Sequence, residues 1–201
     1  MAVTTTAEER DVLYSLISRR RSVRQFSDAP IDQQALIRIL NCAQGVTGSD
    51  GKRGVPSAHA LYPLGLVVVA RCVQDVAPAS YVFDPERTCL DRLASAPAAG
   101  SLLSVSLADD LWLETSAAVI VITADYASAL QHFCDQQADG LRGARYVDVE
   151  AGAVAQNLYL ATLVENLGGV LVMGVDDAAL AKQLGLPAEH QPVALFCLGQ
   201  Y

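Results

Sequence analysis

The longest apolar pattern of the chain lies in residues 145–175 and predicts a long helix, a glycine stop and a buried strand. Apolar and small residues cover the predicted helix nearly all round, which indicates a central, buried position. Gly168 and Gly169 are expected to end the helix, because glycine is the usual residue at a C′ position. The small residues would also permit the close approach of another helix, including one from a second copy of the chain. Three polar residues interrupt the pattern: Glu150, Gln156 and Asn157.

Shorter helices are predicted elsewhere in the chain. Residues 7–19 carry an i, i+1, i+4, i+5 apolar stripe made of Val12, Leu13, Leu16 and Ile17, which is typical of an amphipathic helix. Three further helices are expected to begin at aspartates that act as N-caps: Asp32, Asp125 and Asp176.

Continuous runs of β-branched and other apolar residues predict buried strands. These runs occupy residues 64–73, 80–85, 117–124, 169–175 and 193–199. Residues 89–116 carry little pattern and are expected to be irregular and helical. Four or five strands without strict β-α-β-α alternation indicate an α+β fold rather than a doubly wound one.

The composition is that of an ordered globular chain. Of the 201 residues, 52% are hydrophobic and 18% are charged, and residues 1–201 are expected to form a single domain. No apolar run reaches about 18 residues, so no membrane-spanning helix is expected. The net charge of −8 disfavours nucleic acid as a partner.

The cysteines and the start of the chain bear on its location. The five cysteines are scattered and form no C-x-x-C motif, which indicates reduced thiols in a cytoplasmic protein rather than a disulfide or zinc framework. Residues 1–11 are polar and acidic, which argues against a signal peptide.

A basic segment directly follows the first predicted helix. Four of the 14 basic residues fall within six positions: Arg19, Arg20, Arg21 and Arg24. Arginines at a helix C-terminus bond the last carbonyls and complement the helix dipole, which accounts for the first two. The remaining pair flanks Ser22, and guanidinium groups beside a hydroxyl suit a phosphate. Helix capping and phosphate binding both remain open on this pattern.

The other residue patterns carry little chemistry. His59, His132 and His190 are far apart in sequence and are interpreted as loop or surface histidines rather than metal ligands. The glycine-rich residues 45–56 match no nucleotide-binding loop and are expected to form a mobile surface loop. Residue patterns alone therefore predict an α+β domain with one candidate anion site and no metal.

Three separated segments stand out together: RRSVRQF (20–26), PSAHALYP (56–63) and the long stretch 145–177. Together they resemble the FMN-dependent nitroreductase family, and residues 178–199 also resemble the end of that fold. The second and third segments look closest to the branch that contains azoline dehydrogenases, which make thiazoles and oxazoles. The resemblance implies an α-β-α sandwich with a central mixed or antiparallel sheet. It also implies an intertwined homodimer with two FMN sites at its interface.

The resemblance assigns roles to particular positions. Arg20, Arg21 and Ser22 match residues that hold the flavin phosphate and ribityl chain, and Arg24 matches the basic residue near flavin N1 and the C2 carbonyl. The segment contributed by the partner chain is matched by Pro56, Ser57, Ala58 and Ala60. The backbone beside the flavin, with an amide near N5, is matched by Val172, Met173 and Gly174.

Some positions near the implied site leave two interpretations open. Arg145 and Tyr146 are candidate catalytic residues that would donate protons or hold substrate; the alternative is a salt-bridged arginine and a packed tyrosine. His59 either reaches the substrate cavity or points to solvent. Classical members carry a basic phosphate contact beyond the last strand, and the candidates to replace it are Arg19, Lys52 and Arg53.

The activity implied by the resemblance is hydride transfer from NADH or NADPH to bound FMN, and then to an electron-poor acceptor such as a nitroaromatic or quinone. FMN would carry the redox chemistry while the protein supplies orientation and electrostatics. Two alternatives remain open. One is an FMN-dependent azoline-type dehydrogenase that uses oxygen, and the other is a non-catalytic scaffold of the same fold.

Overall fold

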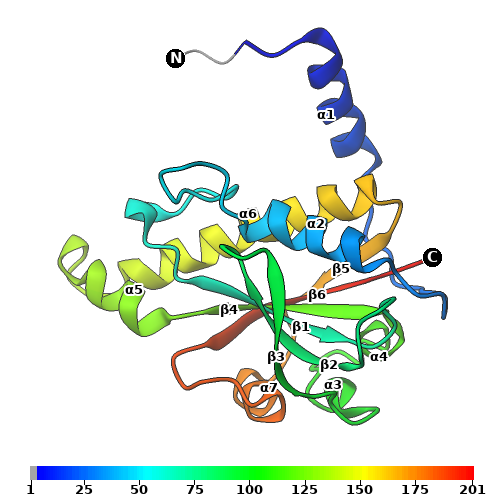
Figure 1. The fold of residues 1–201 in the computed structure, drawn as a ribbon. Coiled ribbons are helices and arrows are strands. Elements are labelled where there is room, and N and C mark those ends of the chain that lie inside the picture. The colour runs from blue at the N-terminus through cyan, green and yellow to red at the C-terminus, as the bar shows by residue number, and fades with distance from the viewer. Residues whose placement is uncertain (1–3) are drawn as a thin grey trace.

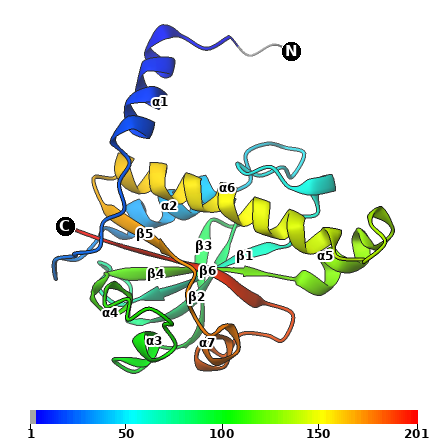
Figure 2. The ribbon, with the colours of Figure 1, turned by 180° about the vertical axis from the view of Figure 1, so that it is seen from behind.

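A computed structural model describes residues 4–201, which fold around one six-stranded sheet (Figures 1 and 2). The strand order is β3-β2-β1-β4-β6-β5, and every neighbouring pair is antiparallel. The strands are β1 (Leu64–Ala70), β2 (Ala79–Asp84), β3 (Cys89–Ser95), β4 (Ala118–Ala124), β5 (Gly168–Val172) and β6 (Gln191–Gly199). Residues 1–3, where the polar start of the chain begins, lie outside this description.

Helices cover both faces of the sheet. On one face lie α2 (Gln33–Gln44), α5 (Tyr126–His132) and α6 (Arg142–Val164), and on the other lie α3 (Ser101–Ser104), α4 (Trp112–Thr115) and α7 (Asp177–Leu184) (Figure 1). The structure therefore confirms the expected α+β fold and α-β-α layering. Among the described residues, no helix has the length and apolar character needed to cross a membrane.

The buried strand patterns follow from this double cover. Along β4, Ile120 and Ile122 pack under α6 and α2, while Val119 and Val121 pack against the opposite layer. Successive side chains of a strand point to opposite faces, so a strand covered on both faces must be apolar at every position. This explains why the strand interiors could be predicted from continuous apolar runs.

The helix α6 is fixed to its neighbours by polar contacts as well as by packing. Three of its own side chains, Val147, Val154 and Leu158, are fully buried against the sheet side of the molecule. The Asn157 side-chain amide donates to the Cys42 carbonyl at 3.0 Å, which ties α6 to α2. At the end of α6, the Arg38 guanidinium donates two hydrogen bonds to the Glu165 carboxylate, at 2.8 and 2.7 Å. A bidentate pair of this kind fixes orientation as well as distance.

Two details of the predicted elements were wrong. Residues 89–95 form the edge strand β3, where irregular structure was expected. The strand was missed because an edge strand exposed to solvent has no continuous apolar run. Gly168 and Gly169 do not end α6, which stops at Val164; Asn166 takes the left-handed conformation instead, with φ of 56°. The glycines begin β5, where a Cβ on Gly169 would lie 2.5 Å from the Phe196 ring.

The first helix, α1 (Ala7–Arg19), projects from the body of the molecule (Figures 1 and 2). Its bounds were predicted correctly, and a capping box between Thr6 and Glu9 fixes its start. It contains no buried residue, and four of its large apolar side chains are 47–62% exposed: Val12, Leu13, Tyr14 and Ile17. The apolar stripe that predicted the helix is therefore left uncovered by the single chain.

Close packing of α5 on α6 predicts a strong effect of one methyl group. A Cβ on Gly143 would collide with the Ala129 backbone carbonyl, so Gly143→Ala should lower the free energy of unfolding by about 2 kcal/mol or more. The matched change Gly152→Ala, in the same helix, meets nothing within 4 Å and should be neutral or slightly stabilising. Urea unfolding of both variants measures this difference. Equal stabilities would contradict the packing described.

Candidate functional site

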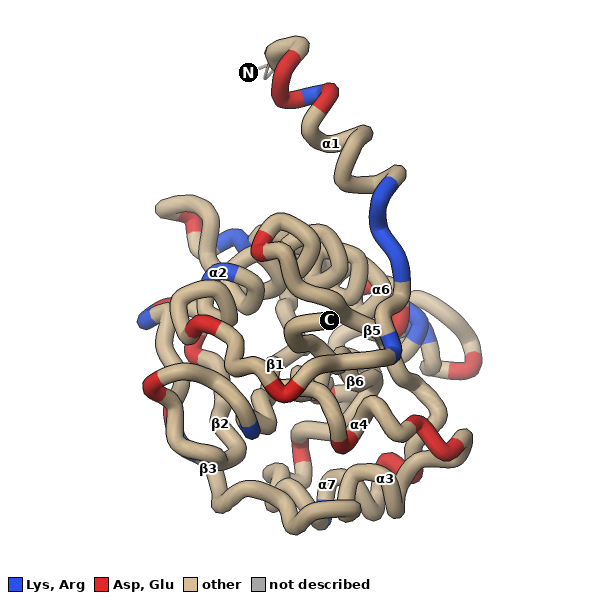
Figure 3. Tube along the Cα trace, turned by 90° about the vertical axis from the view of Figure 1, so that its right-hand side faces the viewer, with Lys and Arg blue, Asp and Glu red and all other residues tan. Residues whose placement is uncertain are grey.

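The basic segment lies against the free edge of the sheet at β5. The Val23 N–H donates to the Gly169 carbonyl at 2.9 Å. Figure 3 shows the basic stretch running from the end of α1 towards β5. The hydroxyl of Tyr159, on α6, shares a hydrogen bond with the Ser22 hydroxyl at 3.0 Å and accepts one from the Leu171 N–H at 2.9 Å. One tyrosine hydroxyl therefore joins the basic segment, the long helix and the edge strand.

A hollow of about 140 Å³, here called the arginine hollow, opens beside this junction. It is lined by Arg19, Arg20, Arg21, Val23, Tyr159, Thr162, Leu163, Leu167, Gly168, Gly169 and Tyr201. No aspartate or glutamate side chain is among these residues. Thr162 is 1% exposed, and its hydroxyl has no hydrogen-bond partner among residues 4–201. A buried hydroxyl without a partner beside three guanidinium groups fits an anionic oxygen ligand such as a phosphate.

The arginines of this segment divide between the two interpretations that the sequence left open. Arg21 donates to the carbonyls of Ser18 and Arg20 at 3.0 and 2.7 Å, which is a capping role. The Arg20 guanidinium stacks 4.9 Å from the Tyr159 ring centre at the hollow. Arg24 points elsewhere, because its guanidinium lies 5.5 Å from the centre of the Trp112 ring. Arg20 and Arg21 therefore line the arginine hollow, whereas the Arg24 side chain lies against Trp112 at the start of α4.

The three candidates for an additional phosphate contact are not equivalent. Lys52 is paired with Asp50 at 2.8 Å. The Arg53 guanidinium donates to the Gln44 side-chain carbonyl at 2.6 Å and stacks on Tyr62. Arg19 is exposed at the end of α1 and lines the arginine hollow. Of the three, Arg19 is therefore the one in position to help hold an anion there.

Val172, Met173 and Gly174 follow at the far end of β5. Val172 is buried and Met173 is 66% exposed, while the Gly174 carbonyl accepts a hydrogen bond from the Leu107 N–H at 2.7 Å. The same edge strand therefore has the arginine hollow at its start and an exposed methionine just beyond its end.

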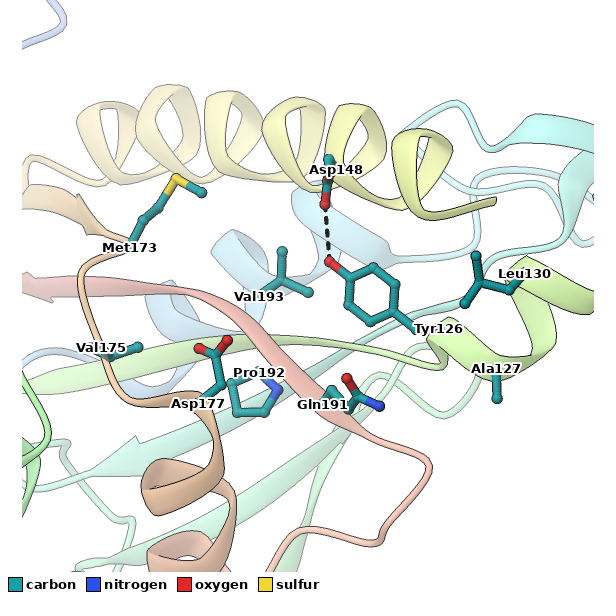
Figure 4. A pocket seen from close by; sticks show the side chains of 10 residues that line it. All are labelled: Tyr126, Ala127, Leu130, Asp148, Met173, Val175, Asp177, Gln191, Pro192 and Val193. Carbon is teal, nitrogen blue, oxygen red and sulfur yellow. Dashed lines mark hydrogen bonds between the residues drawn. The ribbon is translucent and has the colours of Figure 1, made fainter. Parts of the chain in front are cut away.

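A second cavity of about 650 Å³, here called the acidic cavity, opens beside Met173 (Figure 4). It is lined by Tyr126, Ala127, Leu130, Asp148, Met173, Val175, Asp177, Gln191, Pro192 and Val193. The Tyr126 hydroxyl donates to the Asp148 carboxylate at 2.9 Å, and burial together with this bond raises the pKa of Tyr126. Burial, followed by repulsion from Asp176, raises the pKa of Asp177.

The segment Pro56–Ala60 lies far from the arginine hollow of its own chain. The Ser57 hydroxyl accepts a hydrogen bond from the Tyr62 N–H at 2.9 Å, and Ser57 also contacts Glu150 on α6. Glu150 and Tyr159 are nine positions apart, which is about 14 Å along the helix. His59 and Ala60 both take a φ of 55°, which is a costly conformation for non-glycine residues. The segment therefore makes a tight turn that the surrounding contacts must impose.

The two candidate catalytic residues lie outside the lining of both cavities. Arg145 is exposed, and Tyr146 packs its ring 4.6 Å from the Phe133 ring and donates to the Gln136 side-chain carbonyl at 2.8 Å. His59 lies 3.1 Å from His132, nitrogen to nitrogen, and also contacts Phe133. In the single chain this geometry favours the packed-tyrosine interpretation of Tyr146.

Sequence reasoning missed two groups of residues at these cavities. Tyr159 was treated only as part of a helical pattern, although a tyrosine within the otherwise aliphatic and small run of residues 158–164 is itself a signal. The tyrosine–carboxylate pair of the acidic cavity joins residues 22 positions apart on different helices, and no spacing rule connects them.

The comparisons with known proteins agree with one another. The model of the nitroreductase family matches residues 17–200. A candidate nitroreductase of Methanocaldococcus jannaschii is 32% identical over 188 residues, covering 94% of this chain and 90% of that protein.

Two solved structures share the fold. One is a candidate nitroreductase from Ralstonia eutropha JMP134, with a TM-score of 0.74 at 20% identity, covering 94% of this chain and 82% of the other. The other is the Escherichia coli microcin synthetase McbBCD complex with a truncated pro-MccB17 bound. Its matching chain has a TM-score of 0.73 at 18% identity, with 100% of this chain and 75% of the other covered. At these identities the two structures show the fold alone.

The Tyr159 junction predicts a measurable loss of stability. Tyr159→Phe removes the hydroxyl that bonds Ser22 and Leu171, and should lower the free energy of unfolding by about 1–2 kcal/mol. Tyr14→Phe, on the exposed face of α1, is a matched control and should change little. Urea unfolding decides; equal effects of the two substitutions would contradict the role given to Tyr159.

The buried Glu150 predicts a pH dependence with a definite sign. Burial raises the pKa of this carboxyl above the ordinary 4.5, against the weaker opposing effects of Ser57 and Arg53. The folded state then holds the proton more tightly than the unfolded chain, so this residue costs stability as pH rises through its folded pKa. Glu150→Gln should therefore gain stability relative to the original protein between acidic and neutral pH. Urea unfolding across that range tests it, with exposed Glu189→Gln as control, and parallel pH profiles for Glu150→Gln and the original protein would rule it out.

Proposed function

Because this chain belongs to the nitroreductase family, we propose that it is an FMN-dependent oxidoreductase. In this proposal, hydride from NADH or NADPH passes through FMN to an electron-poor acceptor such as a nitroaromatic or quinone. Residues 1–201 would form one FMN-binding domain. The observation that carries the proposal is the arginine hollow, which is lined by three arginines and by a buried threonine whose hydroxyl has no partner among residues 4–201.

The residues at the edge of β5 fit the chemistry of FMN. A phosphate monoester is dianionic near neutral pH, and Arg20 would donate to it, while Arg19 and the capping Arg21 add positive charge beside it. Ser22 is already oriented by Tyr159 towards the same edge and suits a ribityl hydroxyl. The hollow of about 140 Å³ suits the phosphate end of FMN, so the ring must lie outside it.

The end of β5 is the proposed place for the flavin ring. When bound, FMN supplies a ring that accepts a hydride and releases it again. The backbone of Val172, Met173 and Gly174 would lie against this ring, with an amide directed at N5. Arg24 is the proposed cation for the negative charge that reduction places on the ring, and it would have to leave the Trp112 face to act there.

Two features of the single chain support a homodimer, which is part of this proposal. The apolar stripe of α1 is uncovered in the single chain, and several exposed apolar side chains on one helix face are typical of an interaction surface. Ser57 lies beside Glu150 in the first half of α6, away from the arginine hollow at its second half, and Pro56, Ala58 and Ala60 belong to the same short segment. These four residues would reach a flavin only in the other protomer, which makes each proposed site a joint product of two chains.

The azoline-type dehydrogenase is the second candidate. The observation in its favour is the fold shared with a chain of the microcin synthetase complex. In that reaction the substrate would reduce the flavin and oxygen would reoxidise it. Tyr146 already donates its hydroxyl to Gln136, so it would have to exchange this bond for one to substrate.

Cofactor binding tests the proposal directly. The purified protein should quench the fluorescence of added FMN, and Arg20→Ala should weaken this binding about tenfold or more through loss of a charge-assisted contact. Arg92→Ala, an exposed arginine on β3, removes the same charge away from the site and should leave the affinity unchanged. A protein that rejects FMN at saturation would overturn the proposal and favour the scaffold alternative.

A further inference from the structure

We propose that the acidic cavity binds the acceptor and selects flat, cationic molecules, such as aromatic rings bearing a quaternary ammonium group, over anionic ones. Asp148 and Asp177 are the residues that make this selection. The inference rests on the proposed function, because it names the substrate class of the same site.

The position of the cavity follows from where two strands stop. β5 pairs with Leu195–Gly199 of β6 and ends at Val172, so residues 191–194 of β6 have no strand beside them on that edge. The chain turns from Met173 to Asp177 and enters α7 instead of continuing the sheet. α5 and α6 close the other sides (Figure 4). The gap therefore begins at Met173, one of the three residues proposed to lie against the flavin ring.

The charges on the cavity wall have a single sign. Its ten lining residues include two carboxylates and no lysine, arginine or histidine. Asp148 uses one carboxylate oxygen to accept from Tyr126, which fixes its direction and leaves its second oxygen for a ligand. Asp177 points into the cavity from the start of α7 (Figure 4). An anion placed here would meet two like charges, whereas a cation would meet two opposite ones.

The remaining walls suit the body of an aromatic molecule. Met173, Val175, Pro192 and Val193 present apolar surface on the side of the sheet edge, and Leu130 does so from α5. A volume of about 650 Å³ lies in the ordinary range of small-molecule sites. Partial desolvation of its carboxyl and the neighbouring Asp176 raise the pKa of Asp177, so a cation beside it would relieve an existing electrostatic cost.

The test compares two nitroaromatics that differ mainly in charge, para-nitrobenzyl trimethylammonium and para-nitrobenzoate. With the flavin-loaded protein, kcat/KM should favour the cation about tenfold or more at low salt, and the preference should shrink as salt screens the two carboxylates. In Asp148→Asn/Asp177→Asn the preference should fall to about threefold or less. Glu189→Gln, an exposed carboxylate outside the lining, should retain the full preference.

A binding measurement separates this inference from the proposed activity. Calorimetry with para-nitrobenzyl trimethylammonium needs no turnover, and its affinity should fall in the double variant but not in Glu189→Gln. If reduced nicotinamides fail to reduce the flavin while this binding pattern holds, the proposed function fails and the cation site stands. Equal binding of both nitroaromatics, or a preference that survives the double substitution, would overturn the inference. Asp177→Asn alone, at an exposed position, provides the same comparison should the double variant not fold.

Discussion

Burial of α6 against the sheet is the constraint on which both cavities depend. The helix is 23 residues long, about 34 Å, and its fully buried side chains fix it across the sheet. Asp148 near its start faces the acidic cavity, and Tyr159 further on holds the basic segment. A shift of this helix would move both walls at once, so its packing sets the geometry of the site as well as the stability of the fold.

The free edge of β5 is where this rigid framework becomes a surface suited to a ligand. An edge strand leaves backbone groups without partners, and here the basic segment covers the start of the strand while its end remains open. Positive charge gathers at the covered start and negative charge beyond the open end. This arrangement suits two molecules side by side. A cofactor with an anionic tail would place that tail at the start of the strand, and a neutral or cationic acceptor would bind beyond its end. This charge separation along one strand is what joins the proposed FMN site to the proposed acceptor site.

Much of the fold could be predicted from local patterns because those patterns report burial. Continuous apolar runs marked β1 and β4, which are covered on both faces, and the aspartate caps of α2, α5 and α7 were identified from single residues. The edge strand β3 escaped because its polar, solvent-facing residues break the run. Gly168 and Gly169 were misinterpreted because the close approach of Val23 and Phe196, which requires them, comes from other parts of the chain.

The site was less accessible to such reasoning. The arginines could be singled out by their clustering, but the orientation of each depends on Tyr159, Trp112 and the end of α1. The acidic cavity gathers residues from four separate stretches of the chain, and its shape depends on where β5 stops. Only the folded structure brings such residues together.

The proposed function requires this chain to bind FMN and to pass on the hydride of a reduced nicotinamide. Anaerobic stopped-flow mixing of the flavin-loaded protein with excess NADH or NADPH tests it most directly. The visible flavin absorbance should be lost with one of the two nicotinamides and should return when an electron-poor acceptor is added. A flavin that stays bound and oxidised with both would contradict the claim and direct attention to substrates that reduce it themselves.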